Sequence, residues 1–100
     1  MNINTMTDGT KARIAVDGKL TVATSPDLEK EVSNLPETVK DFELDLSGLD
    51  YISSAGLRVL VATQKLADRR EGSMVVRNPC DEVYDIFDMT GLADVFTIER

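Results

Sequence analysis

Apolar residues in strand-like patterns predict five β-strands along the chain. They cover residues 3–6, 12–16, 42–46, 74–76 and 95–98. In the first three segments apolar and polar side chains alternate, which is the period of a strand with one buried face. Asp8-Gly9 is a turn signal, so the first two strands are expected to form a β-hairpin, and Asp17-Gly18 is expected to close the second of them.

Apolar residues at helical spacing predict three helices, over residues 25–35, 54–70 and 81–89. Ser25 is expected to cap the first helix, and Pro26 suits the position after the cap because that N–H has no partner within a helix. Arg58 falls on the polar side of the second helix. Gly72 is expected to follow the end of this helix.

Together these elements predict one α/β domain over residues 1–100, in the order ββαβαβαβ. Residues 49–53 are expected to form a loop between the third strand and the second helix. Strands that alternate with helices indicate a mixed sheet, in which an N-terminal hairpin is followed by parallel strands with helices packed on them. The chain has 42% hydrophobic residues, enough for one core.

The composition excludes several kinds of chemistry. There is no histidine to act as a general base or a metal ligand, and the one cysteine, Cys80, cannot form a disulfide within the chain. The net charge of −7 disfavours binding to nucleic acid or to an anionic membrane. A free thiol and the lack of a long apolar segment indicate a cytoplasmic protein without membrane insertion. We therefore expect a protein that binds other proteins, with no cofactor, no metal and no enzymatic activity of its own.

The most informative segment runs from Asp45 to Leu60, where a strand ends and small residues open a helix. The first N–H groups of a helix lack partners and, with the helix dipole, favour a negative charge. Ser53 and Ser54 place two hydroxyls at this point. They form an ordinary helix cap on the simplest interpretation, and a phosphate on either would be favoured locally. Gly56 costs about 1 kcal/mol relative to alanine, which indicates either close approach by a partner or tight packing on the sheet.

Three parts of the chain together resemble a known family. They are Asp45-Leu46-Ser47-x-Leu49-x-Tyr51-Ile52-Ser53-Ser54-Ala55-Gly56-Leu57-Arg58-x-Leu60, Gly18-Lys19-Leu20 with the helix after it, and Met89-Thr90-Gly91-Leu92. This combination is similar to the STAS domain of anti-sigma-factor antagonists over nearly the whole chain. The resemblance implies a STAS-like fold, which has the same order of elements.

The resemblance also implies a regulatory cycle. Members of the family bind a serine protein kinase that is also an anti-sigma factor, and so free the sigma factor and regulate transcription. The kinase phosphorylates one serine at the start of the second helix, the complex dissociates, and a serine phosphatase resets the cycle. When the family pattern is aligned on Gly56-Leu57, this serine is Ser54, with Ser53 as the alternative acceptor.

The partner-binding surface implied by the resemblance comprises Thr21, Ser53, Ser54, Ala55, Gly56 and Arg58. Two of these residues depart from the family pattern, because Ser53 stands where members usually carry aspartate and Thr21 where many do. The change at Ser53 removes a like charge beside the expected phosphate. A rival interpretation is a STAS subunit of a transport assembly, such as a lipid-transport complex, which needs no phosphorylation.

Four further features are assigned ordinary roles. Cys80 is expected to be an unreactive thiol, because the sequence shows no partner that would activate it. The carboxylates between Asp81 and Asp88 are expected to form a solvated helix face rather than a metal site. Met89 is expected to pack at the end of the third helix, while the resemblance implies that residues 89–92 lie near the binding face, with a minor role in docking as the alternative. Ile52 is expected in the core, and Tyr51 is left open between core and surface.

Overall fold

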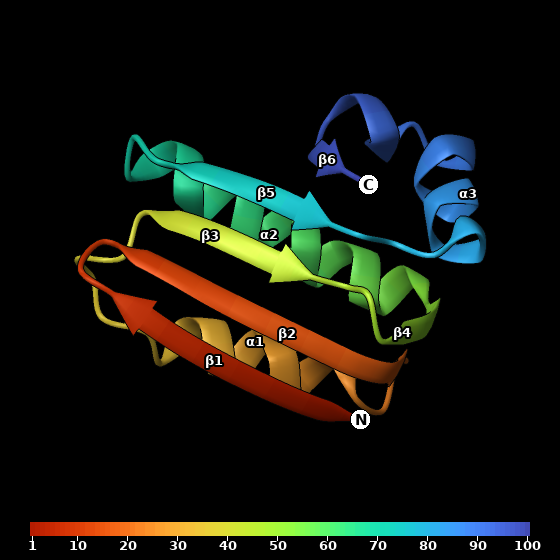
Figure 1. Ribbon diagram of the computed structural model, residues 1–100, viewed down its shortest axis with the longest axis horizontal. Coiled ribbons are helices and arrows are strands. Elements are labelled where there is room, and N and C mark those ends of the chain that lie inside the picture. Colours follow the sequence, from red (N-terminus) through yellow and green to blue (C-terminus); the bar gives the residue numbers. More distant parts are fainter.

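The computed structural model describes residues 1–100 as a mixed six-stranded sheet with three α-helices and one short 3₁₀ helix, η1. In chain order the elements are β1 (Asn2–Asp8), β2 (Lys11–Leu20), α1 (Ser25–Ser33), β3 (Asp41–Asp45), β4 (Leu49–Ile52), α2 (Ser54–Arg69), β5 (Ser73–Arg77), α3 (Asp81–Met89), η1 (Leu92–Asp94) and β6 (Thr97–Glu99) (Figure 1). The strand order is β1-β2-β3-β5-β6, with β4 paired to β2. Only β1 and β2 pair antiparallel, which confirms the predicted hairpin followed by parallel strands.

Strand β2 joins two parts of the sheet. Residues 11–15 pair with β3, and residues 18–20 pair with β4. Within the ladder with β4 the register shifts between Gly18 and Lys19, which pair with Leu49 and Tyr51, and Gly18 has a φ of 101°, which other residues rarely adopt. The prediction that Asp17-Gly18 closes this strand is wrong, because β2 continues through Gly18 to Leu20 and pairs there with β4, where Asp50 is the extra residue of a bulge.

Strand β4 replaces the expected loop and changes the predicted order of elements to ββαββαβαβ. Its two ends, Leu49 and Ile52, are buried, while the two residues between them are exposed. This pattern has no two-residue period, so the sequence carried no strand signal. Pairing with the end of β2 makes the segment a strand.

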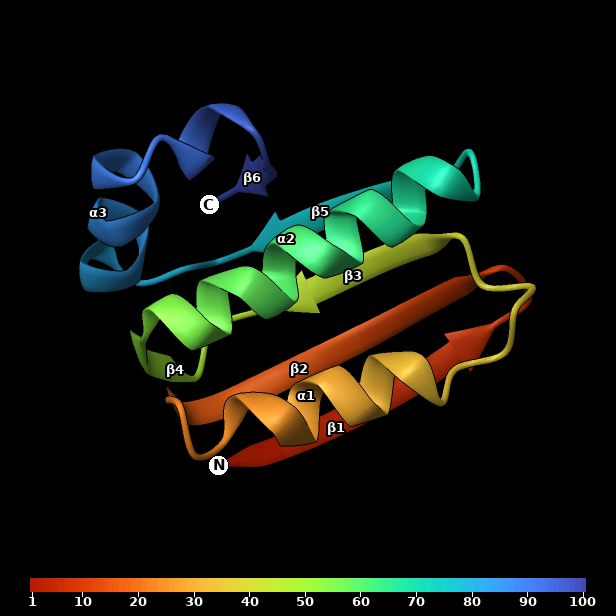
Figure 2. The same cartoon turned by 180° about the vertical axis from the view of Figure 1, so that it is seen from behind.

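The core lies between one face of the sheet and the helices α1 and α2, which cover that face (Figure 2). Buried residues from each layer meet there, among them Phe42 of β3, Leu28 of α1 and Leu60 of α2. The helix α3 lies beyond the end of β5 (Figure 1). Its Phe87 packs edge-on against Phe96, with 5.5 Å between ring centroids. None of the helices combines the length and apolar character needed to cross a bilayer.

The start of α1 differs from the prediction by one residue. Thr24 is the N-cap, and Ser25 is the first helical residue and is buried. The N–H of Ser25 already donates to the carbonyl oxygen of Thr21 at 2.8 Å, so the preceding turn brings Ser25 into the helix. The prediction of Ser25 as the cap is therefore wrong.

The end of α2 also differs from the prediction, because Glu71 rather than Gly72 adopts the left-handed conformation, with a φ of 58°. The N–H groups of Glu71 and Gly72 donate to the carbonyls of Asp68 and Ala67 at 3.1 and 2.8 Å, which is the Schellman arrangement. Gly72 is needed for another reason. A Cβ at that position would overlap the carbonyl oxygen of Lys40.

The sheet face opposite the helices carries a cluster of charged side chains centred on Glu43. This glutamate is only 6% exposed, and it accepts a hydrogen bond of 2.6 Å from Arg77. Arg13 and Lys11 lie 3.0 and 3.5 Å from its carboxylate. The hydrogen bond from Arg77 is the main cause that lowers the pKa of Glu43, and it outweighs the effect of burial.

Candidate functional site

Two turns of the chain meet where β2 and β4 end. The strands run parallel, with Leu20 opposite Ile52. The backbone N–H of Ser53 donates to the carbonyl oxygen of Leu20 at 2.8 Å, which extends the ladder into the turn after β4. Thr21 and Ser53 are distant in the sequence, yet they leave the sheet next to each other.

Ser53 is the N-cap of α2. Its backbone is extended, and its Oγ accepts a hydrogen bond of 3.2 Å from the N–H of Gly56. Its carbonyl oxygen accepts the N–H of Leu57 at 2.9 Å. The side chain is half-buried. For Ser53 the interpretation as an ordinary helix cap is confirmed.

Ser54 is the first residue of α2, and it is exposed. Its hydroxyl forms no hydrogen bond within the protein, in contrast to that of Ser53. The N–H groups of Ser54 and Ala55 have no acceptor inside the helix, as at the start of any helix, and the first turn holds no acidic residue. A negative charge on Ser54 would therefore lie at a favourable end of the helix dipole.

Thr21 and Thr24 fix the neighbouring turn by reciprocal hydrogen bonds. The N–H of Thr21 donates to Oγ1 of Thr24 at 2.8 Å, and Oγ1 of Thr21 accepts the N–H groups of Ala23 and Thr24 at 3.2 and 3.3 Å. Thr21 is half-buried and serves as an acceptor for backbone groups. An aspartate side chain can accept the same kind of bond.

Gly56 packs the start of α2 against the paired strand ends. The residue is buried, and a Cβ there would lie 2.8 Å from Cγ of Leu20 and 2.9 Å from Cγ1 of Ile52. Of the two interpretations of this glycine, tight packing on the sheet is the one that the structure supports. Gly56 thus lets the first turn of α2 lie close to the ends of β2 and β4. The neighbouring Ala55 is half-buried.

A shallow hollow of about 440 Å³ begins beside Ser54 and follows α2. It is lined by Ser54, Leu57, Arg58, Val61, Ala62, Lys65 and Leu92. Both charged residues in it, Arg58 and Lys65, are basic, and both are exposed, which confirms the polar side predicted for Arg58. Neither belongs to any of the six ion pairs of the protein. In a chain of net charge −7, the hollow is a region of unpaired positive charge.

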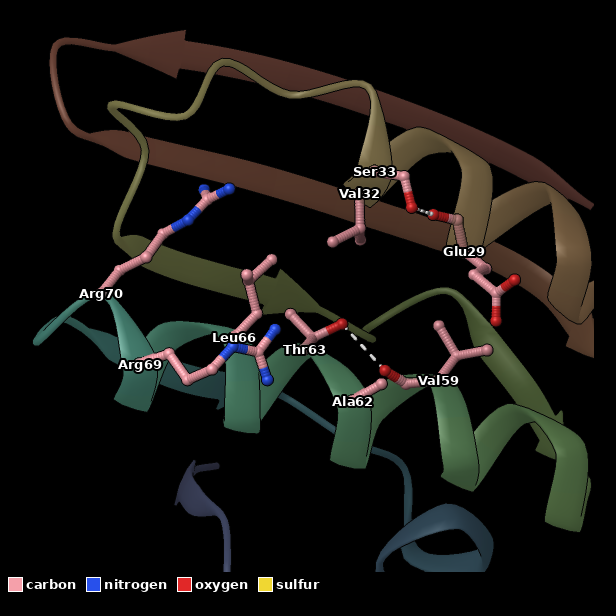
Figure 3. A pocket seen from close by; sticks show the side chains of 9 residues that line it. All are labelled: Glu29, Val32, Ser33, Val59, Ala62, Thr63, Leu66, Arg69 and Arg70. Carbon is pink, nitrogen blue, oxygen red and sulfur yellow. Dashed lines mark hydrogen bonds between the residues drawn. The ribbon is translucent and has the colours of Figure 1, made fainter.

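A second hollow, of about 330 Å³, lies between α1 and α2 (Figure 3). It is lined by Glu29, Val32, Ser33, Val59, Ala62, Thr63, Leu66, Arg69 and Arg70. Arg70 donates to the carbonyl oxygen of Val39 at 2.6 Å, so its guanidinium is already bound to the loop before β3. None of the predicted site residues lines this hollow.

Sequence reasoning missed the exposed residue Val22 beside this site, and it left open whether Tyr51 is buried or exposed. Val22, in the turn after β2, is 73% exposed, and Tyr51, on β4, is 46% exposed. Both side chains are available for contact with another protein. The sequence signal that could have identified Val22 is an apolar residue between Thr21 and Thr24, in a segment with no apolar periodicity.

Met89 and Cys80 lie away from these turns in the sequence. Met89 is 78% exposed, so the prediction that it packs is wrong. The buried residues of α3 are Val83 and Phe87, and Met89 comes two residues after Phe87, on the other side of the helix. Cys80 is half-buried, and its Sγ lies 3.4 Å from the carbonyl oxygen of Leu49.

The fold is a small α/β domain with one mixed sheet, and comparison with known proteins shows which family it belongs to. The family model "STAS domain" matches residues 3–100, so the chain belongs to the STAS domain family. The anti-sigma-B factor antagonist of Bacillus subtilis (strain 168) is 28% identical over 98 residues, which cover 98% of this chain and 90% of that protein.

Two solved structures show the same fold. A candidate anti-sigma factor antagonist from Thermotoga maritima superposes with a TM-score of 0.90 at 18% identity, covering 98% of this chain and 86% of that one. The Bacillus cell fate determinant SpoIIAA, in its phosphorylated form, superposes with a TM-score of 0.77 at 15% identity, covering 97% of this chain and 90% of that one.

Proposed function

We propose that this protein is an anti-sigma-factor antagonist that binds a serine protein kinase acting as an anti-sigma factor. Phosphorylation of Ser54 releases it from the kinase, and a serine phosphatase restores the binding form. By holding the kinase, the unphosphorylated protein frees a sigma factor and regulates transcription. The full-length similarity to the anti-sigma-B factor antagonist of Bacillus subtilis supports this proposal. In this cycle, which we place in the cytoplasm, the protein is a ligand and a substrate rather than a catalyst.

The observation that carries the proposal is the difference between the two adjacent serines. The hydroxyl of Ser53 is half-buried and caps α2, whereas the hydroxyl of Ser54 is exposed and unbonded. A kinase active site must surround the accepting hydroxyl, so the exposed one is the better substrate. This contrast favours Ser54 over Ser53 as the acceptor.

The transfer itself needs no catalytic group from this chain. Oγ of Ser54 would bond to the terminal phosphorus of ATP held by the kinase, the phosphoanhydride bond would break, and ADP would leave. The hydroxyl proton would pass to a base of the kinase. The domain contributes an accessible nucleophile on a rigid helix start.

Release follows from the charge added at the docking surface. We place the contact on the two turns and the start of α2, where Val22 and Tyr51 are exposed beside Ser54. A phosphoserine adds about −1.5 to −2 charges at neutral pH. Burying this charge against a partner without a matching cation costs several kcal/mol. The phosphorylated protein therefore dissociates without any need to refold.

The direct test is phosphorylation by a serine kinase of the anti-sigma type from the same organism. The protein is incubated with the kinase and ATP, and the modified residue is mapped by mass spectrometry. We expect one phosphate, on Ser54, in the wild type and in Ser53→Ala, and none in Ser54→Ala. A phosphate on Ser53 or elsewhere would refute the assignment.

Binding measurements separate this proposal from a transport-subunit role. We expect the kinase to bind the wild type and Ser54→Ala with similar affinity, and Ser54→Asp at least tenfold more weakly. Equal binding of the kinase to both variants would contradict the switch. Recovery of transporter components in place of the kinase would support the transport role instead.

A further inference from the structure

Arg58 lies one helical turn beyond Ser54 and has no partner. The two residues are four positions apart in α2 and line the same hollow. Side chains four residues apart share one side of a helix, and a long helical side chain points back toward the N-terminus. In this geometry an extended Arg58 side chain can reach along the helix surface toward the hydroxyl of Ser54.

Nothing in the hollow neutralises Arg58. The only charged residues that line it are Arg58 and Lys65, and the η1 residue at its edge, Leu92, is apolar. The first turn of α2 holds no acidic side chain, and Arg58 takes no part in an ion pair. An arginine kept free of carboxylates beside an exposed serine is suited to a group that becomes negative only after modification.

We propose that Arg58 binds the phosphoryl group of phosphorylated Ser54 and holds it against α2. The inference rests on the proposed phosphorylation of Ser54. A guanidinium presents planar donors that match phosphate oxygens and form charge-assisted hydrogen bonds with them. The bound phosphate then stays fixed at the docking surface in its dianionic form.

Lys65 provides a matched control within the same hollow. It is also basic and exposed, but it lies eleven residues beyond Ser54 in α2. This separation is about 16 Å along the helix axis. Since charges in 0.1 M salt are screened beyond about 10 Å, Lys65 has little effect on a phosphate at Ser54.

The test uses the full chain with phosphoserine installed at position 54 by genetic encoding or chemical synthesis. The second pKa of the phosphate is measured by ³¹P NMR titration in the wild type, Arg58→Gln and Lys65→Gln. We expect Arg58→Gln to raise this pKa by about 0.5 units, because a nearby positive charge favours the dianion. We expect Lys65→Gln to match the wild type, and 1 M salt to remove most of the difference.

Two results would overturn the role of Arg58. One is an unchanged phosphate pKa in Arg58→Gln, and the other is an equal shift in Lys65→Gln, which would reflect net charge alone. Both residues are exposed, and circular dichroism verifies that each variant is folded. The phosphate is installed without a kinase, so this result is independent of the proposed function. That function fails separately, if phosphorylated Ser54 leaves kinase binding unchanged.

Discussion

At the residue scale, helix capping gives two adjacent serines different environments. The residue before a helix has an extended backbone and turns its side chain toward the free N–H groups. Ser53 occupies that position, and its Oγ accepts the N–H of Gly56. Ser54 is already helical, so its side chain points outward and its hydroxyl stays available.

Removal of the cap tests this difference. Ser53→Ala is expected to lower the free energy of unfolding by about 1 kcal/mol, and Ser53→Asp to leave it within about 0.5 kcal/mol, because aspartate caps as well as serine. Urea denaturation measures both. Ser54→Ala is the control and should change stability by less than about 0.5 kcal/mol. Equal losses at Ser53 and Ser54 would show that Ser53 does not cap the helix.

The close packing at Gly56 gives a second prediction. Gly56→Ala should lower the free energy of unfolding by about 1–3 kcal/mol, because the added methyl group overlaps Leu20 and Ile52. This loss is expected despite a gain of about 1 kcal/mol in helix propensity.

An alanine-to-glycine substitution at an exposed position of α2 is the control for Gly56→Ala. Ala62→Gly, at an exposed position of α2, should destabilise by about 1 kcal/mol through propensity alone. Thermal or urea unfolding compares the two variants. A stabilised Gly56→Ala would mean that Leu20 and Ile52 move aside at no cost.

The sequence could predict the exposed position of Arg58, because the periodicity of a helix determines which side chains face solvent. The spacing of apolar residues in α2 indicated that Arg58 faces solvent, which the structure confirms. The preference for Ser54 over Ser53 came from the family resemblance, because periodicity alone does not show which residue is the last with an extended backbone. Exposed Val22 was also missed, because no periodic pattern extends through a turn.

At the element scale, the start and end of each segment depend on contacts between elements. Strand β4 carries an extra residue in its pairing with β2 and has no alternation of its own, so only its partner makes it a strand. The prediction that Asp17-Gly18 ends β2 fails because a glycine inside a strand and a glycine at a turn look alike in the sequence. Long periodic segments such as β3 and α2 were predicted close to their observed bounds.

The end of α2 provides a prediction at this scale. Glu71 is in the left-handed conformation, which costs a residue with a Cβ about 1–2 kcal/mol. Glu71→Gly should therefore raise the free energy of unfolding by about 0.5–1 kcal/mol, since glycine's greater freedom in the unfolded chain offsets part of the gain. Urea denaturation measures the change. Glu37→Gly, at an exposed loop position where φ is negative, should not stabilise. A destabilised Glu71→Gly would contradict the argument.

At the scale of the whole molecule, the two faces of the sheet have opposite characters. One face is buried under α1 and α2, and the other carries the ion pairs around Glu43. Asp45 joins this cluster through Arg13 at 3.3 Å. The N–H of Ser47 is the main cause that lowers the pKa of Asp45. The cluster connects β2, β3 and β5 on the side that has no helix.

The cluster predicts how stability depends on pH. Because folding lowers the pKa of Glu43 and of Asp45, their contribution is complete above the ordinary values of 4.5 and 3.8 and is lost as the pH falls through the lowered values. Glu43→Gln should reduce stability at pH 7 by about 1 kcal/mol. The deficit should shrink as the pH falls below about 4.

Thermal unfolding from pH 7 to pH 3 measures this dependence. Glu37→Gln is the matched control, since Glu37 is exposed and outside the ion pairs, and it should follow the wild type at each pH. A deficit in Glu43→Gln that stays constant down to pH 3 would show that the carboxylate charge is not the source of the effect.

The parallel pairing of β2 with β4 has a consequence for how recognition can evolve. Both turns extend from hydrogen-bonded strand ends, so the surface is preorganised and association freezes little of the backbone. If the proposed function holds, exchanges at exposed positions such as Val22, in the turn after β2, and Tyr51, on β4, alter selectivity among partner kinases while the scaffold stays intact. Under that function, one genome can hold several copies of this domain that differ in partner choice through a few exposed residues on the same scaffold.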